Sequence, residues 1–291
     1  MPVLIGTSGW QYRDWRGVLY PPGLAERDWL EYYAGRYGTV ENNGTFYRLP
    51  ATDTFAGWRA KVPDGFVMTV KASRYLTHIR RLRDPAEPVA RLLGAAAGLG
   101  DRLGPVLLQL PPNLRADAAA LDTCLREFAR FTGSGASGGQ VPATTPGSAA
   151  SGGLVAATTP GSAASGGRVR VAVEFRHASW WTEETRQLLA SHNAALCWVD
   201  RLGRPSAPLW RTADWGYLRF HEGAAQPWPR YGAQALRSWV RRAGEAWPDS
   251  ADVFVYFNND QHAAALYDAA AFASIARHAG RHVTPAPEPG T

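Results

Sequence analysis

The chain has 291 residues, of which 45% are hydrophobic and 19% charged, and its formal net charge at pH 7 is +6. This composition can bury a sizeable core, which excludes an intrinsically disordered chain, a collagen and a small disulfide-stapled domain. Two cysteines, Cys124 and Cys197, cannot build a disulfide framework or a four-thiolate zinc site, so we expect both to be buried as small apolar residues.

The N-terminal sequence does not resemble a targeting segment. Residues 1–10 lack a basic start followed by an apolar run, and no stretch of the chain approaches the roughly 18 consecutive apolar residues of a membrane helix. We therefore expect a cytoplasmic protein without membrane association.

Short apolar or β-branched runs alternate with longer amphipathic segments along the chain, as expected for parallel strands joined by helices. The predicted strands are residues 3–7, 39–43, 66–72, 105–110, 169–175, 195–200, 216–221 and 252–258. The predicted helices are residues 26–37, 88–98, 116–129, 183–192, 233–246 and 267–278. Residues 201–214 are rich in proline and are predicted to form a loop in place of a helix.

A low-complexity segment interrupts this pattern at residues 131–167. It carries no charged residue and contains the sequence ATTPGSAASGG twice. Such a composition offers little apolar surface to offset the entropy lost on ordering, so we interpret it as a flexible surface insertion. The proline-rich residues 283–291 are predicted to be a loose tail.

Without the insertion, residues 1–282 are close to the size of about 250 residues that is typical of one (β/α)8 barrel. Eight strands in this order favour a single TIM-type barrel over a doubly wound sheet. No GxGxxG or GxxxxGK[ST] motif follows a predicted strand, so a nucleotide-binding sheet has no support. Active sites of such barrels lie at the carboxyl ends of the strands.

The insertion connects the fourth helix to the fifth strand, which places it on the barrel face opposite those strand ends. We expect that deleting residues 133–167 leaves the melting temperature and any activity nearly unchanged. Thermal unfolding of the shortened chain checks this prediction, and a large fall in melting temperature would contradict it.

Two glutamates stand at the ends of apolar runs. Glu41 ends the run TVE and Glu174 ends VAVE. Burial at a barrel mouth would raise the pKa of a carboxyl group, so the pair could act as acid and base, or as acid and nucleophile. The alternative is that each forms a salt bridge, with Arg176 or Lys71, that only holds the mouth together.

Lys71 and His221 complete the predicted catalytic group. Lys71 is one of two lysines in a chain that otherwise uses arginine, which suits a compact, titratable amine for acid–base chemistry or anion binding, with Schiff-base chemistry as a further alternative. His221 ends the seventh strand, close to where many barrels hold phosphate. Arg176 and Arg219 lie two positions from Glu174 and His221, so each pair shares a strand face.

Other polar or aromatic residues at strand ends are predicted to bind substrate. They are Ser8, Trp10, Asn43, Gln109, Arg176, His177, Asn258 and Asp260. Trp10 belongs to an aromatic loop with Tyr12, Trp15 and Tyr20, which could stack on a sugar or a flipped base, or could plug the barrel top as a local core.

The cofactor prediction is less specific. Carboxylate, imidazole and amide side chains at the strand ends are compatible with Mg²⁺, Mn²⁺ or Zn²⁺. No local ligand pair such as HExxH is present, so the sequence requires no metal and no other cofactor.

Several motifs in order resemble the YecE-like family, a group with a domain of unknown function. They are IGTSGWQYRDWRGVLYPPGL, WLEYYAGRYGTVENNGTFYRLP, GPVLLQLPP, VAVEFRHASWW, LRFH and VYFNND. The resemblance implies a TIM-type barrel and adds Tyr47 and Asn259 to the site positions, but it brings no established reaction. Where the family reads close to VEINSTFY, this chain departs at Asn42 and Gly44.

The leading hypothesis is an enzyme, a hydrolase or an isomerase, that uses carboxylate-based acid–base chemistry on a sugar-like or phosphorylated small molecule. A second hypothesis is a nucleic-acid-binding or repair-type phosphodiesterase, because residues 201–242 contain eight arginines and two acidic residues. A third is a ligand-binding protein without catalysis.

Overall fold

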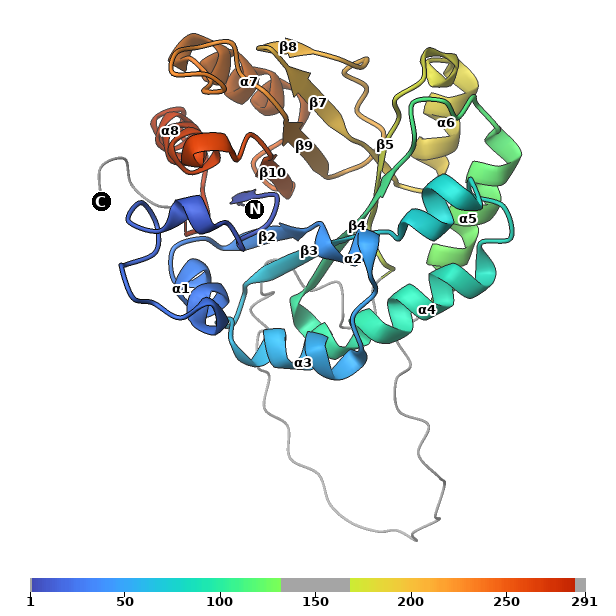
Figure 1. The fold of residues 1–291 in the computed structure, drawn as a ribbon. Helices are drawn as coiled ribbons and strands as arrows, with labels where there is room; N and C mark the ends of the chain where they lie inside the picture. The colour runs from blue at the N-terminus through green and yellow to red at the C-terminus, as the bar shows by residue number, and fades with distance from the viewer. Residues whose placement is uncertain (1, 132–167, 286–291) are drawn as a thin grey trace, which may run out of the picture.

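The structure is a computed structural model that describes residues 2–131 and 168–285. Within these ranges the strands form two five-stranded sheets, and the helices lie around the outside of the strands (Figure 1). The strands are β1 Val3–Thr7, β2 Thr39–Asn42, β3 Val67–Lys71, β4 Leu103–Gln109, β5 Val171–Glu174, β6 Ala195–Leu196, β7 Trp198–Arg201, β8 Arg204–Pro205, β9 Gly216–Phe220 and β10 Val253–Phe257. Each of the eight predicted runs therefore contains a strand.

The order of strands is β1-β10-β9-β7-β8 in one sheet and β2-β3-β4-β5-β6 in the other. Neighbouring strands are parallel except for the short antiparallel pair of β7 and β8. The predicted loop at residues 201–214 thus contains one short strand. Because the pairs are parallel, the carboxyl ends of the long strands lie at one edge of each sheet.

The two sheets meet at both of their flanks. Cys197 alone separates β6 from β7, and its N–H donates to the carbonyl oxygen of Val173 on β5 at 2.9 Å, while Trp198 pairs with Leu218 on β9. At the other flank, a Cβ on Gly6 of β1 would overlap the carbonyl oxygen of Thr39 on β2. Glycine at this position therefore allows the two strands to lie close together.

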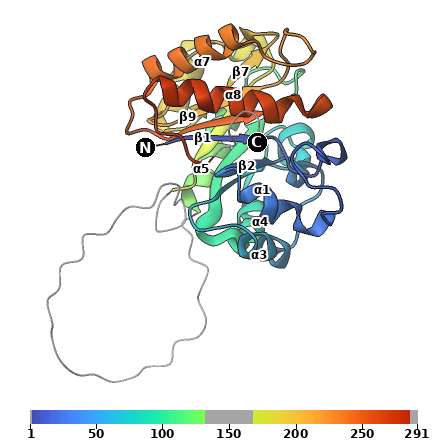
Figure 2. The ribbon, with the colours of Figure 1, turned by 90° about the vertical axis from the view of Figure 1, so that its left-hand side faces the viewer.

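The helices are α1 Trp29–Ala34, α2 Gly44–Tyr47, α3 Thr52–Ala60, α4 Ala86–Ala96, α5 Ala118–Arg130, α6 Glu183–Ser191, α7 Ala233–Ala246 and α8 Ala264–His278. Seen from the side, α7 and α8 cover β1 from above and α1, α3 and α4 lie below it (Figure 2). The Asp117 side chain caps α5 by accepting the Ala120 N–H at 3.0 Å, and Thr182 caps α6 in the same way.

Each predicted helix corresponds to a helix of the structure, whereas the short α2 and α3 were not predicted. Phe55 is the one fully buried residue of α3, so its sequence lacks the apolar periodicity that marks α5. The tail prediction was wrong for residues 283–285. Val283 bridges to Val3, and the carbonyl oxygen of Pro285 accepts the Gly38 N–H at 2.7 Å. The predicted insertion, apart from Phe131, and the rest of the tail lie outside the described residues.

Strand residues alternate between two buried clusters. One set packs under the helices, and the other fills the space between the two sheets with Leu4, Val67, Leu107, Ala172, Ala195, Tyr217, Phe254 and Tyr256. Both cysteines are free and buried, as predicted. Following the second set toward the carboxyl ends of the strands leads to charged residues, which make up the candidate site.

Candidate active site

A buried arginine connects the two glutamates. Arg219 of β9 donates from Nη2 to Glu41 Oε1 at 2.8 Å and from Nη1 to Glu174 Oε2 at 2.5 Å. Nη1 also donates to Gln109 Oε1 at 3.1 Å. All three charged side chains are at most 1% exposed. The ends of β2, β4, β5 and β9 are therefore joined through one guanidinium group.

The Glu41 carboxylate accepts two further hydrogen bonds. The Ser8 hydroxyl donates to Oε1 at 2.7 Å and the Tyr217 hydroxyl donates to Oε2 at 2.6 Å. Burial acts to raise the pKa of Glu41, but Arg219, Tyr217 and Ser8 together hold it below its usual range. This corrects the prediction that burial would raise the pKa of this carboxyl group.

The pKa of Glu174 is also lowered, although burial predicted that it would be raised. Its Oε1 accepts a hydrogen bond from Arg176 Nε at 2.9 Å and lies 3.6 Å from His221 Nε2. Burial again opposes ionisation, yet Arg219, His221 and Arg176 bring the pKa of Glu174 well below its usual range. Both carboxylates are thus ionised, so neither is a proton donor at neutral pH.

His221 is oriented by Asn258, whose Nδ2 lies 3.0 Å from Nδ1. With the amide donating, Nδ1 accepts and the neutral ring carries its proton on Nε2. Burial lowers the pKa of His221, which keeps the ring neutral at pH 7. Nε2 is buried and has no hydrogen-bond partner among the described residues. The Nε2–H therefore has only a long contact, with Glu174 Oε1 at 3.6 Å, which a closer ligand oxygen would replace.

Lys71 ends β3 beside the same network and is 8% exposed. Its Nζ lies 4.5 Å from the centre of the Phe46 ring, where the π face attracts a cation. Burial and the positive charge of Arg219 lower the pKa of Lys71 to about 8, against the opposing effect of Glu41 and Glu174. The amine therefore loses its proton close to neutral pH, as an acid–base group requires.

A lysine-specific NMR titration tests this environment. With both lysines isotopically labelled, we expect the Lys71 Nζ signal to titrate near pH 8, because burial disfavours its charged form. Lys61→Arg should leave that signal unchanged, and Lys71→Arg should remove it. A signal that titrates only above about pH 10 in the Lys61→Arg variant would contradict the prediction.

A cavity of about 500 Å³ adjoins this network. Its walls include Glu174, Arg176, Trp181, Arg201 and His221. The cavity lies at the ends of β5, β7 and β9, where neighbouring parallel strands bring these side chains together. The four basic side chains of this region (Arg176, Arg201, Arg219 and Lys71) outnumber its two carboxylates, so the net positive charge makes this cavity attractive to an anion. We call it the arginine cavity.

The other predicted binding residues separate into two groups. Ser8, Gln109, Arg176 and Asn258 belong to the network described above.

Asn43, two positions after Glu41, is half-buried, and its buried Oδ1 lacks a partner in the described part of the chain. Asp260 and Asn258 line a second cavity of about 210 Å³ that also includes His221. Burial raises the pKa of Asp260 to about 7.

Three predicted binding residues lie elsewhere. Trp10 is 4% exposed and packs edge-on against Trp58 in the core, and Tyr47 is 81% exposed. His177 accepts the Ser179 N–H on Nδ1 and caps a short 3₁₀ turn. The aromatic loop is a local core, since Trp15 and Tyr20 are fully buried. The other interpretation of this loop, a stacking platform, was therefore wrong for these side chains.

Two network residues, Tyr217 and Arg219, are not among the predicted site residues, although Arg219 was noted for sharing a strand face with His221. Both alternate with His221 along β9, so all three face the interior. Polar residues at every second position of an otherwise apolar strand were the available signal. The sequence does not show that Arg219 reaches two glutamates that are 178 and 45 positions away.

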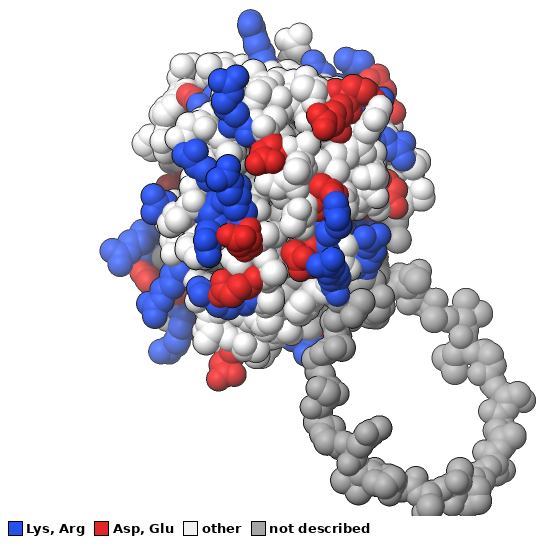
Figure 3. Space-filling view, turned by 90° about the vertical axis from the view of Figure 1, so that its right-hand side faces the viewer, with Lys and Arg blue, Asp and Glu red and all other residues white. Residues whose placement is uncertain are grey.

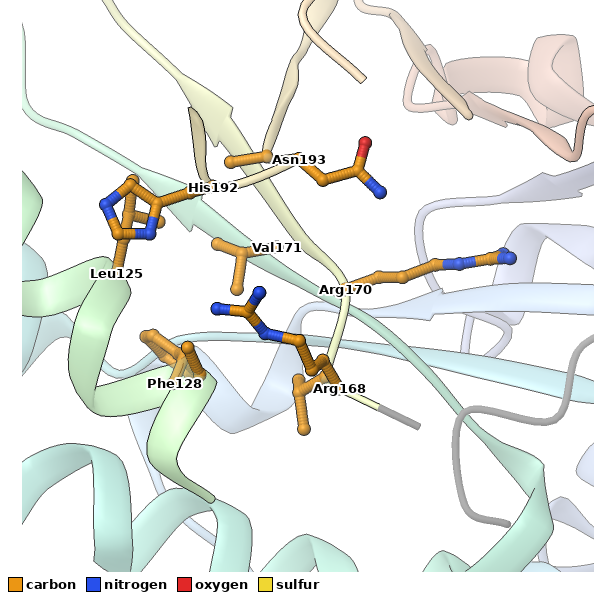
Figure 4. A pocket seen from close by; sticks show the side chains of 10 residues that line it. Leu125, Phe128, Arg168, Arg170, Val171, His192 and Asn193 are labelled. Atoms are coloured by element: carbon orange, nitrogen blue, oxygen red, sulfur yellow. The ribbon is translucent and has the colours of Figure 1, made fainter. Parts of the chain in front are cut away.

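A smaller cavity of about 120 Å³ lies near the start of β5 (Figure 4). The Arg168 guanidinium points between Phe128 and Val171, whereas Arg170 extends away from the cavity. Arg170 is paired with Asp252 at 2.6 Å, and His192 with Asp122 at 2.8 Å. This cavity lies at the amino end of β5, whereas the charged network lies at the carboxyl ends of the strands.

No group of three or more His, Cys, Asp or Glu side chains in residues 2–131 and 168–285 is arranged to hold a metal ion. No helix in those same ranges is long and apolar enough to cross a membrane.

Fold and site together define an α/β protein of parallel sheets with a buried, charged network at the carboxyl ends of its strands. A family model described as a protein of unknown function, DUF72, matches residues 4–291, so the chain belongs to the DUF72 family. The motif resemblance to a family of unknown function is thereby confirmed at this level.

Individual relatives agree with this assignment. The chain is 24% identical to the UPF0759 protein YunF of Bacillus subtilis (strain 168) over 89% of each chain. A crystal structure of a DUF72 family protein from Thermotoga maritima MSB8 is similar with a TM-score of 0.68 and 24% identity, covering 95% of this chain and 100% of that one. A DUF72 family protein from Enterococcus faecalis V583 gives a TM-score of 0.68 at 16% identity, over 94% and 95% of the two chains. These likenesses show the fold alone.

Proposed function

We propose that this chain is an acid–base enzyme of the closed (β/α)8 type that acts on a phosphorylated, sugar-like small molecule. The continuity of β6 with β7 and the close approach of β1 to β2 support barrel closure. The observation that carries the function is the buried network of Arg219, Glu41 and Glu174, which opens through His221 into the arginine cavity.

The charge balance of the site favours an anionic substrate. Arg219 lies between Glu41 and Glu174, and Arg176, Arg201 and Lys71 add positive charge around them. A phosphate group in the arginine cavity would accept charge-assisted hydrogen bonds from Arg176 and Arg201. Trp181 supplies an aromatic wall for the rest of the ligand.

The ionisation states favour proton abstraction next to a carbonyl over hydrolysis by a pair of carboxyl groups. Glycoside hydrolysis needs one protonated carboxyl beside a second carboxylate, but both Glu41 and Glu174 are ionised by their contact with Arg219. Asp260, whose pKa is about 7, lines the second cavity and not the arginine cavity. Lys71 can accept a proton near pH 8, and the neutral His221 can donate Nε2–H to the substrate oxygen that gains charge. The two glutamates then hold Arg219 and the imidazole in place.

A turnover screen tests the proposal. Pentose and hexose phosphates are assayed for isomerisation and hydrolysis, and single-stranded and abasic DNA are included as competing substrate classes. We expect turnover of a sugar phosphate that Lys71→Met lowers by about 10²–10⁴-fold, the typical contribution of a general acid or base. Unchanged turnover in Lys71→Met, or turnover of the DNA substrates alone, would contradict the proposal. Tight binding without turnover would assign a ligand-binding function.

The nucleic-acid hypothesis has less support because its stacking element is buried. On the face that carries α5 and α6, which is opposite the side where α7 is seen in Figure 2, positive and negative side chains lie next to one another (Figure 3). Of the arginines between positions 201 and 242, Arg219 is buried in the network and Arg230 pairs with Asp268.

A further inference from the structure

We propose that the second cavity is a subsite for the hydroxyl-rich part of the substrate, next to a phosphate subsite in the arginine cavity. This deepens the proposed function and rests on it. The second cavity has a volume of about 210 Å³ and is lined by Glu222, Trp228, Asn258, Asn259, Asp260 and Gln261, together with His221 and Pro229. We call it the amide cavity.

The topology places the two cavities next to each other. The arginine cavity is built on the ends of β5, β7 and β9, whereas the amide cavity is built on the ends of β9 and β10. β9 lies between β7 and β10 in the sheet. His221, directly after β9, is the residue that lines both cavities. One ligand that spans both would therefore pass His221.

The two linings differ in charge. The arginine cavity carries Arg176 and Arg201, but no lysine or arginine lines the amide cavity. The amide cavity instead offers Glu222, Asp260 and three side-chain amides. A second phosphate would be repelled there, while hydroxyl groups can donate to the carboxylates and accept from the amides. The pair of cavities thus suits a molecule that is anionic at one end and neutral at the other.

Buried polar atoms in the amide cavity lack partners. Asn259 is 2% exposed and its Oδ1 has no hydrogen-bond partner in the described ranges. Its Nδ2 is held by Asp268 at 2.7 Å and by the carbonyl oxygen of Pro229 at 3.1 Å, so the amide is fixed. Asp260 Oδ1 is unpaired in the same sense. Leaving buried polar atoms unpaired is costly, and ligand hydroxyls would satisfy them.

Trp228 supplies an apolar surface to the same cavity. It is 45% exposed, and its Nε1 donates to Glu222 Oε1 at 3.1 Å, which anchors one edge of the indole. An exposed aromatic face beside carboxylate and amide groups matches the two sides of a sugar, whose C–H groups stack while its hydroxyls form hydrogen bonds.

Calorimetric titration of the full chain tests the subsite. The probes are inorganic phosphate, ribose 5-phosphate, glucose 6-phosphate and the two free sugars. We expect at least one sugar phosphate to bind about 10-fold more tightly than inorganic phosphate, the equivalent of one good additional interaction. Trp228→Ala and Asp260→Asn should remove this advantage without changing the affinity for inorganic phosphate.

Arginine variants distinguish a failure of the subsite from a failure of the proposed function. Arg201→Ala should weaken inorganic phosphate and the sugar phosphate by the same factor, and Arg91→Ala, an exposed arginine of α4, should change neither. If phosphate binding depends on Arg201 but the sugar gives no advantage, or the advantage survives both amide-cavity variants, the subsite proposal alone is overturned. If inorganic phosphate does not bind, or binds independently of Arg201, the proposed function fails and this inference fails with it.

Discussion

Replacing Arg219 with methionine is expected to lower the free energy of unfolding by about 3–5 kcal/mol at pH 7. The guanidinium is 1% exposed and pairs with both Glu41 and Glu174, which are equally buried. Removing it leaves two carboxylates in a site where burial alone penalises their charge. The loss should therefore far exceed that of a surface ion pair.

The pH dependence has a definite sign. In the native protein the folded-state pKa values of Glu41 and Glu174 are lowered, so their contribution to stability is present above the unfolded values, near 4.3, and is lost as the pH falls through the folded values. In Arg219→Met, burial without the cation should raise both folded pKa values. The variant then regains stability as the carboxyls protonate, so the difference from the native chain should shrink between pH 7 and pH 5.

Urea unfolding at the two pH values measures this effect. Arg176→Met is the matched control, because Arg176 also pairs with Glu174 but is 34% exposed, and its loss should cost at most about 1 kcal/mol. Should Arg219→Met fail to fold, the triple variant with Glu41→Gln and Glu174→Gln removes the uncompensated charges and should fold again. Equal losses for Arg219→Met and Arg176→Met would contradict the network.

Replacing His221 with phenylalanine is expected to lower kcat by about 10²–10³-fold while the protein stays folded. The phenyl ring keeps the approximate shape of the imidazole but removes the Nε2–H of the residue that lines both cavities. A donor aimed at developing negative charge acts mainly in the transition state, so kcat should fall more than the affinity for substrate.

The measurement is steady-state turnover of the sugar phosphate found by the screen, with the melting temperature recorded for each variant. His278→Phe, the same substitution at an exposed position of α8, should leave both quantities unchanged. A fall in affinity with unchanged kcat would assign His221 a binding role only.

Strand positions were readable from the sequence because a buried parallel strand is a short apolar run between polar segments. The polar residue that ends such a run marks the carboxyl edge, and this located Glu41, Lys71, Gln109, Glu174 and His221. Helix α3 was not predicted because Phe55 is its one fully buried residue, so its sequence shows little apolar periodicity. The local pattern therefore predicted the strands and the amphipathic helices, but not the short α2 or the weakly amphipathic α3.

The protonation states could not be read in the same way. Burial of Glu41 and Glu174 was anticipated correctly, but the sign of each pKa shift depends on the distance to a cation from another strand. A run of residues such as LRF does not reveal how far its arginine reaches. The interpretation of the Trp10 loop as a stacking platform was wrong for a related reason, because an aromatic residue near the barrel mouth can equally pack into the core beneath it.

Diffraction from crystals soaked in tungstate would test the central claim most directly, because this phosphate analogue is located by its anomalous scattering. We predict a bound tungstate whose oxygens lie within hydrogen-bond distance of Arg176 and Arg201, near His221. Tungstate found only at other surfaces, such as the cavity beside Arg168, with the strand-end site empty, would contradict it.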